Sequence, residues 1–574
     1  MRESGYTREN QLKPANDRAS LRGQISAAGI IIGCIGCVII TASSVYTALK
    51  MGALPWPTIF TSITALVLLR ALGRSSLNEA NVTQIIMSAG SMVAGGLAFT
   101  VPGLWMLGMA DQVSWVEMLG VALAGTLLGL VCTALIRRRF VEDSGLEYPI
   151  GTAAAETLMA SRAGGKTGRK LFGSMALAGI WCALRDLAGA IPAMLCALPI
   201  PGVAFGIYNS PMLLSVGFLV GGAAVAFWFA GGLVANLGIV VGGTAAGAWD
   251  VATAQGIVQS LGMGLMMGSG LGVVLRDILP KAMAHLRGAG AGNGSVREAA
   301  PIRDRGVLAL LVAAAALLIC LVLGVSPVLC VAVVALAFVT TVMSAQSVGQ
   351  TGIDPMEIFG LIVLLAIAAL GESDQVKLFF IAGVVAVACG LAGDVMSDFK
   401  TGHILGTDPR AMWVGQAVGA LLGAVVSVAV MVALLKAYGP ESFGPGKLFV
   451  SAQASVVATM VSGIPSTGAF LLGLAGGVVL YCLGIPSMML GLGVYLPFYM
   501  TITAALGACV KWAYDRIATR RDAARRGTGH GAVDGEAETT HEESGIIIAS
   551  GVLGGESIVG VIIALMSVAG GLLG

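Results

Sequence analysis

Asp394 and Asp398, two aspartates four residues apart, are the residues in this sequence whose type and spacing are best suited to chemistry. On a continuous helix this spacing places both carboxylates on one face. Two carboxylates held together resist double ionisation, so the pair suits the binding of a proton or a cation. The alternative is that Asp398 caps a helix end and Lys400 lies in cytoplasmic water. Asp398 and Lys400 can pair only if the helix breaks after Asp398, which the Thr401-Gly402 step could supply.

More ionisable residues interrupt apolar stretches, where charge is costly and usually serves a function. Arg185 and Asp186 are adjacent in one apolar run and would point about 100° apart on a helix. We therefore expect each to have a partner on another helix, in a structural ion pair or a coupling site. Four acids near expected helix ends are interpreted as exposed loop or capping residues: Asp250, Asp354, Glu372 and Asp374.

The elements that must position these groups are membrane helices. Of the 574 residues, 56% are hydrophobic and 11% are charged, and the mean hydropathy is +0.89. Soluble proteins carry about 25% charged residues, so the composition excludes an ordinary soluble enzyme. The sequence therefore predicts an all-α, polytopic integral membrane protein with about 16 transmembrane helices, some of them broken or re-entrant.

Charge placement predicts the topology and the domain limits. With a cytoplasmic N-terminus, 28 of the 33 Lys and Arg residues lie in or directly beside the segments that face the cytoplasm. We expect a cytoplasmic tail at 1–23 and a polytopic membrane domain at 24–509. A charged, disordered cytoplasmic linker is expected at 510–544, followed by a last transmembrane helix of the same domain at 545–574.

Other motifs predict no additional chemistry. Residues 160–167 miss the phosphate-binding loop pattern, because Ala160 replaces its first glycine and no strand precedes it. Cys34 and Cys37 have no accompanying His or second pair, so they are interpreted as small buried hydrophobic residues. The net charge of +2 gives no basic excess for nucleic acid. We expect no metal site, no cofactor and no nucleic-acid partner.

Pro and Gly interrupt several apolar stretches where polar residues gather. Broken helices free backbone groups that can line a substrate cavity, as in many transporters. Simple kinks are the alternative interpretation. The breaks lie at 53–57, 148–152, 463–467 and 484–487.

Several strings resemble signatures of the oligopeptide transporter (OPT) family, in family order along nearly the whole chain. Residues 394–406, with Pro409, Arg410 and Gln416, resemble its most characteristic block, and 147–156 matches its Tyr-Pro-x-Gly-Thr-Ala segment. The remaining strings are 43–60, 78–83, 87–102, 352–359 and 550–556.

This resemblance implies secondary active uptake, usually proton-coupled, of small peptides or peptide-like metal chelates. The Asn-Pro-Gly and Lys-Ile-Pro-Pro-Arg strings of the eukaryotic peptide branch do not occur here. Their absence favours the prokaryotic and yellow-stripe-like side, and a transporter specific for metal chelates is one alternative. The implied location is the bacterial inner membrane. The implied partners are substrate, protons and the lipid bilayer, with a homo-oligomer left open.

The predicted site combines these signatures with the polar, broken segments. Substrate binding or translocation is expected at six residues around one cavity: Asn81, Thr83, Tyr148, Thr152, Lys400 and Gln416. Proton coupling is expected at Glu156 and Asp398, with Glu79 and Glu556 in reserve.

Two other classes of function find less support. A channel would need a ring of repeated pore-lining residues, and the sequence has no repeat of that kind. An intramembrane enzyme would need a metal or nucleophile constellation, and His403 is the sole histidine near the expected site. A transporter that is not an enzyme is therefore the leading hypothesis.

The charge bias generates a prediction about orientation. In Asn10→Cys and His530→Cys variants, a membrane-impermeant thiol reagent should label the new cysteine only when it reaches the cytoplasmic face. The parent protein, with its ten native cysteines, gives the background. Labelling of either position from outside intact cells would reverse the assigned topology.

Overall fold

The computed structural model describes residues 21–51, 57–146, 148–160, 166–273, 275–276, 305–352, 354–462, 465–527 and 541–573. Within these ranges, seven helical stretches are long and apolar enough to cross a membrane, and seven shorter apolar helices accompany them. The expected all-α, polytopic fold is confirmed. The expected tail at 1–23 lies almost wholly outside the described residues.

The first half of the chain is helical except for one β-hairpin. Its helices are α1 (Leu21–Gln24), α2 (Ala27–Met51), α3 (Pro57–Ala71), α4 (Leu77–Ala98), α5 (Pro102–Met106), η1 (Ala110–Gln112), α6 (Trp115–Arg137), η2 (Arg138–Asp143), α7 (Pro149–Ala160), α8 (Lys166–Cys182) and η4 (Ala183–Leu187). The hairpin consists of antiparallel strands β1 (Met194–Ile200) and β2 (Val203–Tyr208). After it come α9 (Pro211–Val220), α10 (Gly222–Leu233), η5 (Val234–Gly242), α11 (Gly243–Ala245) and α12 (Val251–Val273).

The second half is also helical. Its elements are α14 (Arg305–Leu321), α15 (Pro327–Thr351), α16 (Met356–Ala369), α17 (Gln375–Ala392), α18 (Val395–Leu405), α19 (Pro409–Tyr438), η7 (Pro440–Ser442), α20 (Ala452–Ser462), α21 (Thr467–Cys482), α22 (Ser487–Tyr495), α23 (Phe498–Gly527) and α24 (His541–Leu573).

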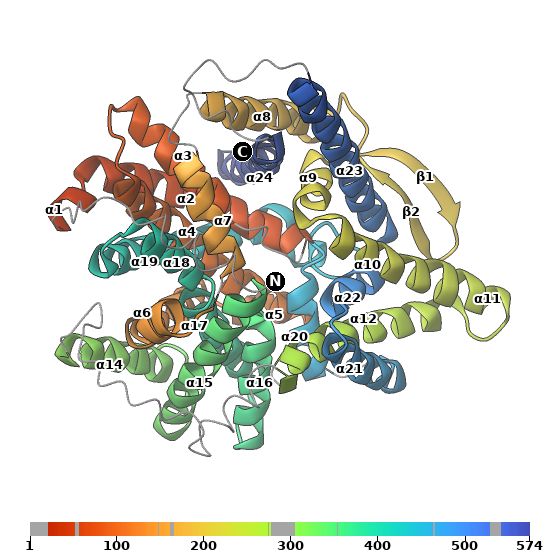
Figure 1. Ribbon diagram of the computed structural model, residues 1–574. Helices are drawn as coiled ribbons and strands as arrows, with labels where there is room; N and C mark the ends of the chain where they lie inside the picture. The colour runs from red at the N-terminus through yellow and green to blue at the C-terminus, as the bar shows by residue number, and fades with distance from the viewer. Residues whose placement is uncertain are drawn as a thin grey trace.

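Helices that are distant in sequence lie side by side (Figure 1). On the left of the view, α2, α4 and α6 contact α17 and α19 from the second half. On the right, α9, α10 and α12 contact α21, α22 and α23. The C-terminal helix α24 contacts α2 and α19 as well as α8 and α9, so it joins the two groups.

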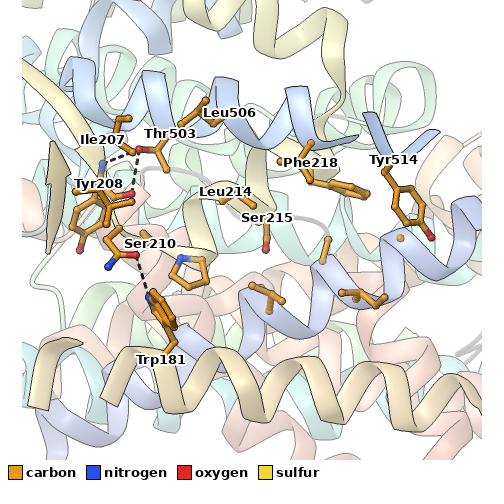
Figure 2. A pocket seen from close by; sticks show the side chains of 18 residues that line it. Trp181, Ile207, Tyr208, Ser210, Leu214, Ser215, Phe218, Thr503, Leu506 and Tyr514 are labelled. Carbon is orange, nitrogen blue, oxygen red and sulfur yellow. Dashed lines mark hydrogen bonds between the residues drawn. The ribbon is translucent and has the colours of Figure 1, made fainter. Parts of the chain in front are cut away.

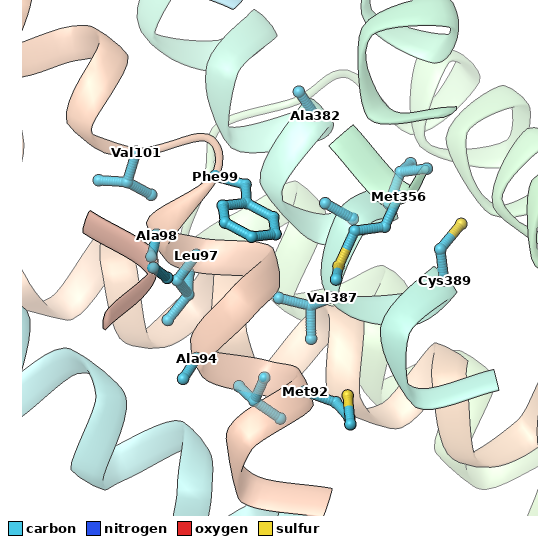
Figure 3. Packing of buried hydrophobic residues seen from close by; sticks show 14 of the residues in the cluster. Met92, Ala94, Leu97, Ala98, Phe99, Val101, Met356, Ala382, Val387 and Cys389 are labelled. Carbon is cyan, nitrogen blue, oxygen red and sulfur yellow. The ribbon is translucent and has the colours of Figure 1, made fainter. Parts of the chain in front are cut away.

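The centre of the left group is formed by α4 and α17. An 18-residue window of Leu77–Met106 is 100% buried inside the protein, and one in Gln375–Leu405 is 94% buried. The corresponding window of Pro409–Tyr438 is only 50% buried, so that helix has one face toward lipid. Met92 of α4 and the adjoining Phe99 lie on the side that faces Val387 of α17 and Met356 of α16 (Figure 3). Polar side chains on α4 from Glu79 onward, and Asp398 and Thr401 on α18, are therefore surrounded by protein.

Three segments differ from the expectations. The all-α prediction did not include the β-hairpin: the helical chain ends at Leu187 and leads into β1 and β2, because prolines 192, 199 and 201 cannot continue a helix. Helix α23 continues to Gly527, through half of the expected linker, because residues 511–526 are rich in good helix formers such as Ala, Arg and Lys.

The third difference concerns the break near Asp398. Helix α18 runs without interruption to Leu405, so the expected break at Thr401-Gly402 does not occur. The chain instead breaks before Asp398, between α17 and α18, where Gly393 approaches α15. A Cβ on Gly393 would lie 1.8 Å from the Ser344 Oγ atom, so only glycine fits at this junction.

The α4–α19 crossing depends on glycine in the same way. A Cβ on Gly423 of α19 would lie 2.2 Å from the Cα atom of Gly90 on α4. A Cβ on Gly419, one turn earlier, would lie 2.1 Å from the Ile86 carbonyl oxygen. Lipid gives no hydrophobic drive for helix association, so close backbone approach at small residues is the main source of attraction.

We expect Gly423→Val to separate these helices and to cost at least about 1–3 kcal/mol through overpacking. Gly173→Val on α8 is the matched control, because a Cβ there has no atom within 4 Å. The measurement is the thermal unfolding midpoint of both purified variants in detergent. Equal midpoints would contradict a close α4–α19 crossing.

Candidate functional site

Asp398 lies at the centre of a buried polar site. It is in the first turn of α18, and its exposed fraction is 0%. The Gln84 Nε2 atom donates a 2.6 Å hydrogen bond to its Oδ1, and the Ser88 hydroxyl donates to its Oδ2. The Thr58 hydroxyl of α3 also bonds this carboxylate. Within the described ranges, no Lys or Arg forms an ion pair with Asp398, so neutral donors alone hold it.

Three buried carboxamide side chains lie on α4 and α19, one of them bound to Asp398, and within the described residues each leaves its oxygen without a hydrogen-bond partner. They are Asn81, Gln84 and Gln416, all with an exposed fraction of 0%. The Gln416 Nε2 atom donates to the Leu391 carbonyl oxygen at 2.7 Å and to the Thr133 hydroxyl at 3.1 Å. A buried acceptor without a donor is costly, so an additional donor, such as a protonated carboxyl group, a water or a cationic group, would stabilise the Gln84 oxygen beside Asp398.

Helix α7 brings further predicted residues beside α18. The Thr401 hydroxyl donates a 2.8 Å hydrogen bond to the Gly151 carbonyl oxygen. A Cβ on Gly151 would lie 2.1 Å from the Ser397 carbonyl oxygen, so the two helices touch through their backbones. Thr152 is the next residue on α7 and is half-buried. Glu156 is one turn further along α7, but its side chain lies outside the described residues.

Tyr148, Thr83 and Lys400 have different surroundings. The Tyr148 hydroxyl is buried and donates to the Ala345 carbonyl oxygen at 3.0 Å, so it ties the start of α7 to α15. Thr83 is buried where α4 meets Gly29 of α2. Lys400 is partly exposed, and on the unbroken α18 it does not share a face with Asp398. The close Asp398–Lys400 pair that a helix break would allow is therefore not formed.

The two reserve carboxylates are engaged elsewhere. Glu79 lies in the first turn of α4, where its Oε1 is 2.6 Å from the Arg74 Nε atom. The Ser26 hydroxyl also donates to Glu79. Glu79 therefore fastens the start of α4 to the loop before it and to α2.

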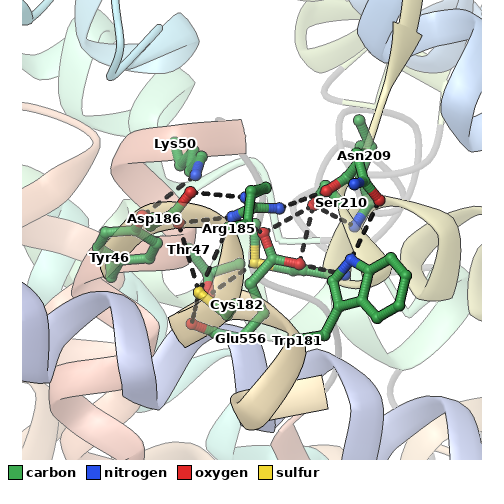
Figure 4. Close-up of polar contacts among 12 residues, drawn as sticks. Tyr46, Thr47, Lys50, Trp181, Cys182, Arg185, Asp186, Asn209, Ser210 and Glu556 are labelled. Atoms are coloured by element: carbon green, nitrogen blue, oxygen red, sulfur yellow. Dashed lines mark hydrogen bonds and ion pairs between the residues drawn. The ribbon is translucent and has the colours of Figure 1, made fainter. Parts of the chain in front are cut away.

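Glu556 belongs to a second buried cluster (Figure 4). Its Oε1 is 2.8 Å from the Arg185 Nη2 atom, and both side chains have an exposed fraction of 0%. Its two oxygens also accept hydrogen bonds from the Ser210 hydroxyl, and Oε2 accepts one from the Met212 amide at 2.8 Å. This amide belongs to the first turn of α9, where the helix dipole favours a negative charge.

Arg185 also pairs with its neighbour. Its Nε atom is 2.6 Å from the Asp186 Oδ1 atom, because both residues lie in the π-helical turn η4. Arg185 pairs across helices as expected, with Glu556 of α24, whereas the hydrogen bonds of Asp186 within the described residues are local, to Arg185 and Cys182. Lys50 of α2 completes the cluster, donating to the Tyr46 hydroxyl at 3.1 Å and lying 5.5 Å from the Tyr208 ring centroid.

The acids interpreted as loop or cap residues divide into two groups. Asp374 caps α17 by accepting from the Val376 amide at 3.0 Å, and Asp250 accepts from the Thr253 amide at 3.0 Å, which confirms both as caps. Glu372 is half-buried in the loop before α17, where its Oε1 accepts from the Ser373 and Asp374 amides at 3.1 Å. Asp354 is not an exposed residue, because both its carboxylate oxygens are buried. It precedes Pro355 at the junction of α15 and α16. This junction packs against Gly393, where a Cβ would lie 2.8 Å from the Asp354 Oδ2 atom.

Sequence reasoning missed Gln84 and Ser88, which bind Asp398 directly. Their signal was present in the spacing of Asn81, Gln84 and Ser88, which are three and four residues apart and so share one face of α4. A polar face on a membrane helix requires a protein partner, and that reasoning would have identified both residues.

The comparisons with known proteins agree with this architecture. The sequence profile of the OPT oligopeptide transporter proteins matches residues 24–567, so the chain belongs to the OPT family. It is 24% identical to a Haemophilus influenzae protein named for oligopeptide transport, over 91% of this chain and 92% of the relative. Plant metal-nicotianamine transporters match a shorter region. For one from Oryza sativa subsp. japonica, the identity is 38% over 14% of this chain and 12% of the relative.

The Arg185–Glu556 pair should be essential for stability. In Arg185→Met, the buried Glu556 loses its cation, and we expect a cost of about 3–5 kcal/mol. The double variant Arg185→Met/Glu556→Met should be less damaged, because it leaves no uncompensated charge between these two residues. Thermal unfolding midpoints in detergent measure both effects.

Lys377→Met provides the control for this experiment. Lys377 lies 3.9 Å from Asp374 in a partly exposed pair, which should contribute about 0–1 kcal/mol. If Arg185→Met and Lys377→Met shift the midpoint equally, the Arg185–Glu556 pair does not hold α24 in place.

Proposed function

We propose that this OPT-family transporter is a proton-coupled symporter that imports small oligopeptides or peptide-like metal chelates. The single observation that carries the coupling proposal is the environment of Asp398. This carboxylate is completely buried, and within the described part of the chain it is held by neutral donors beside the Gln84 carboxamide oxygen, which lacks a donor. Protonation supplies the missing donor and removes a buried charge, so the site can take up a proton as part of a transport cycle.

The substrate path in this proposal runs beside Asp398. The polar residues of this path lie on or beside helices α4, α7, α18 and α19. The chain breaks at Gly393 before α18, and close glycine contacts join α7 to α18 and α4 to α19. We assign substrate contacts to six residues that become accessible as these helices move: Asn81, Thr83, Tyr148, Thr152, Lys400 and Gln416. Glu156 is the second coupling residue in this proposal, because α7 lies directly against α18.

Glu79 and Glu556 receive a structural role instead. Each is paired with an arginine, and each joins helix ends that must stay together. Glu556 in particular holds α24 against η4 and the first turn of α9. A carboxylate with these fixed partners is suited to an anchor rather than to a proton carrier.

Both substrate classes are supported by relatives. The Haemophilus influenzae relative is named for oligopeptides and covers nearly the whole chain, whereas the plant relatives are named for metal-nicotianamine and cover a short region. We therefore place peptide and chelate uptake side by side and propose chelate-only transport as the second candidate. A bacterial inner-membrane location with a cytoplasmic N-terminus completes the proposal, supported by the distribution of Lys and Arg.

The driving force is sufficient for such uptake. One charge moved through about 100 mV contributes roughly 2.3 kcal/mol, which corresponds to about fiftyfold accumulation. We expect Asp398→Asn to abolish accumulation driven by a pH gradient and to leave substrate exchange largely intact, because the amide keeps the size and polarity of the side chain but cannot carry the proton. Proteoliposomes loaded with a labelled tripeptide or an iron–nicotianamine complex provide the measurement.

Asp374→Asn is the matched control. Asp374 is an exposed cap of α17, and asparagine is an equally good cap. Gradient-driven uptake by Asp398→Asn at the level of Asp374→Asn would remove Asp398 from the coupling mechanism. Loss of both uptake and exchange in Asp398→Asn would place the residue in substrate binding instead.

A further inference from the structure

Two apolar cavities flank helix α23, away from the Asp398 site. The first has a volume of about 460 Å³ and lies between α9, α23 and α24 (Figure 2). Its walls include Leu214, Phe218, Val510 and Ile548. The second has a volume of about 570 Å³ and lies between α10 and α23. Leu506 of α23 lines both cavities, so one helix separates two spaces that each suit an apolar chain.

Where the apolar part of α23 ends, near the middle of this helix, a cation lies beside each cavity. The Lys511 Nζ atom lies 5.3 Å from the ring centroid of Phe218, which lines the first cavity. The Arg516 guanidinium lies 4.5 Å from the ring centroid of Trp512, which lines the second. Asp515 lies 3.6 Å from Lys511 and offsets part of this charge.

A third cation, Lys170, lies near the same part of α23. The Lys170 Nζ atom of α8 donates a 2.7 Å hydrogen bond to the Ser544 hydroxyl. Ser544 immediately precedes Gly545, which lines the first cavity near Phe218 and Tyr514. Basic side chains and aromatic rings at the end of a membrane helix are typical of the headgroup region of a bilayer.

The opposite end of the first cavity is closed by polar groups that satisfy one another. The Trp181 Nε1 atom donates to the Asn209 Oδ1 atom at 3.1 Å, and the Tyr208 amide donates to the Thr503 hydroxyl at 3.0 Å (Figure 2). Because these two donors already have acceptors, an apolar chain that reaches this end buries no unpaired donor there.

We propose that an anionic diacylphospholipid binds astride α23, with one acyl chain in each cavity and its phosphate beside Lys511 and Arg516. Two apolar spaces divided by one helix match the two chains of a phospholipid, and the cations at one end match its negative headgroup. The bound lipid fills the space between α9, α23 and α24, and so supports the helix that carries Glu556.

The test compares lipids on the full-length protein. Purified protein in detergent receives phosphatidylglycerol or phosphatidylcholine with identical acyl chains, and retained lipid and the unfolding midpoint are measured by native mass spectrometry and thermal denaturation. We expect phosphatidylglycerol to be retained preferentially. The double variant Lys511→Gln/Arg516→Gln should weaken its binding by about fivefold for each cation removed. Arg410→Gln/Lys436→Gln, which removes two charges from α19, is the control.

Leu506→Trp tests the cavities themselves, because the larger side chain enters both. Leu421→Trp is its control, since Leu421 on α19 is 41% exposed and Leu506 is 39% exposed. We expect Leu506→Trp to lose retained lipid of either headgroup and Leu421→Trp to keep it. Equal retention by the two Trp variants, equal binding of the two headgroups by the parent, or a stable dimer without retained lipid would each overturn the proposal.

Discussion

The absence of water from the bilayer core is the constraint on which this structure depends. Helix α4 carries a row of amide and hydroxyl side chains, and hydrocarbon would leave every one of them unpaired. The protein meets this constraint by enclosing α4 completely, with α2, α3, α17, α18 and α19 around it. The enclosure requires close crossings, such as the one at Gly90 and Gly423, where no side chain separates the two backbones.

The two buried carboxylates Asp398 and Glu556 have contrasting surroundings. Glu556 meets Arg185 and the first turn of α9, so its charge is compensated within a network that joins three parts of the chain, η4, the start of α9 and α24. Asp398 meets only neutral donors within the described residues. A compensated network favours one arrangement of helices, whereas a carboxylate among neutral groups can alternate between two protonation states. The first arrangement is suited to holding the scaffold together, and the second to coupling.

The two groups of helices are connected through α24. This helix contacts α2 and α19 on one side and α8 and α9 on the other. Its Glu556 anchor lies on one of its faces, and the first apolar cavity lies along another part of the same helix. Motion between the two groups must therefore involve α24 and the helices that hold it, which links the ion network, the proposed lipid site and any alternation of access.

The sequence by itself determined the class of protein, because composition and apolar run length depend only on the solvent that surrounds the chain. It also predicted the capping roles of Asp250 and Asp374, which are local properties. It could not determine what Asp398 binds, since Gln84 and Ser88 are 314 and 310 residues away along the chain. Nor could it place the helix break at Gly393 or the pairing of Arg185 with Glu556. Those features arise when distant helices meet at a particular depth and rotation, and the tertiary structure alone sets both.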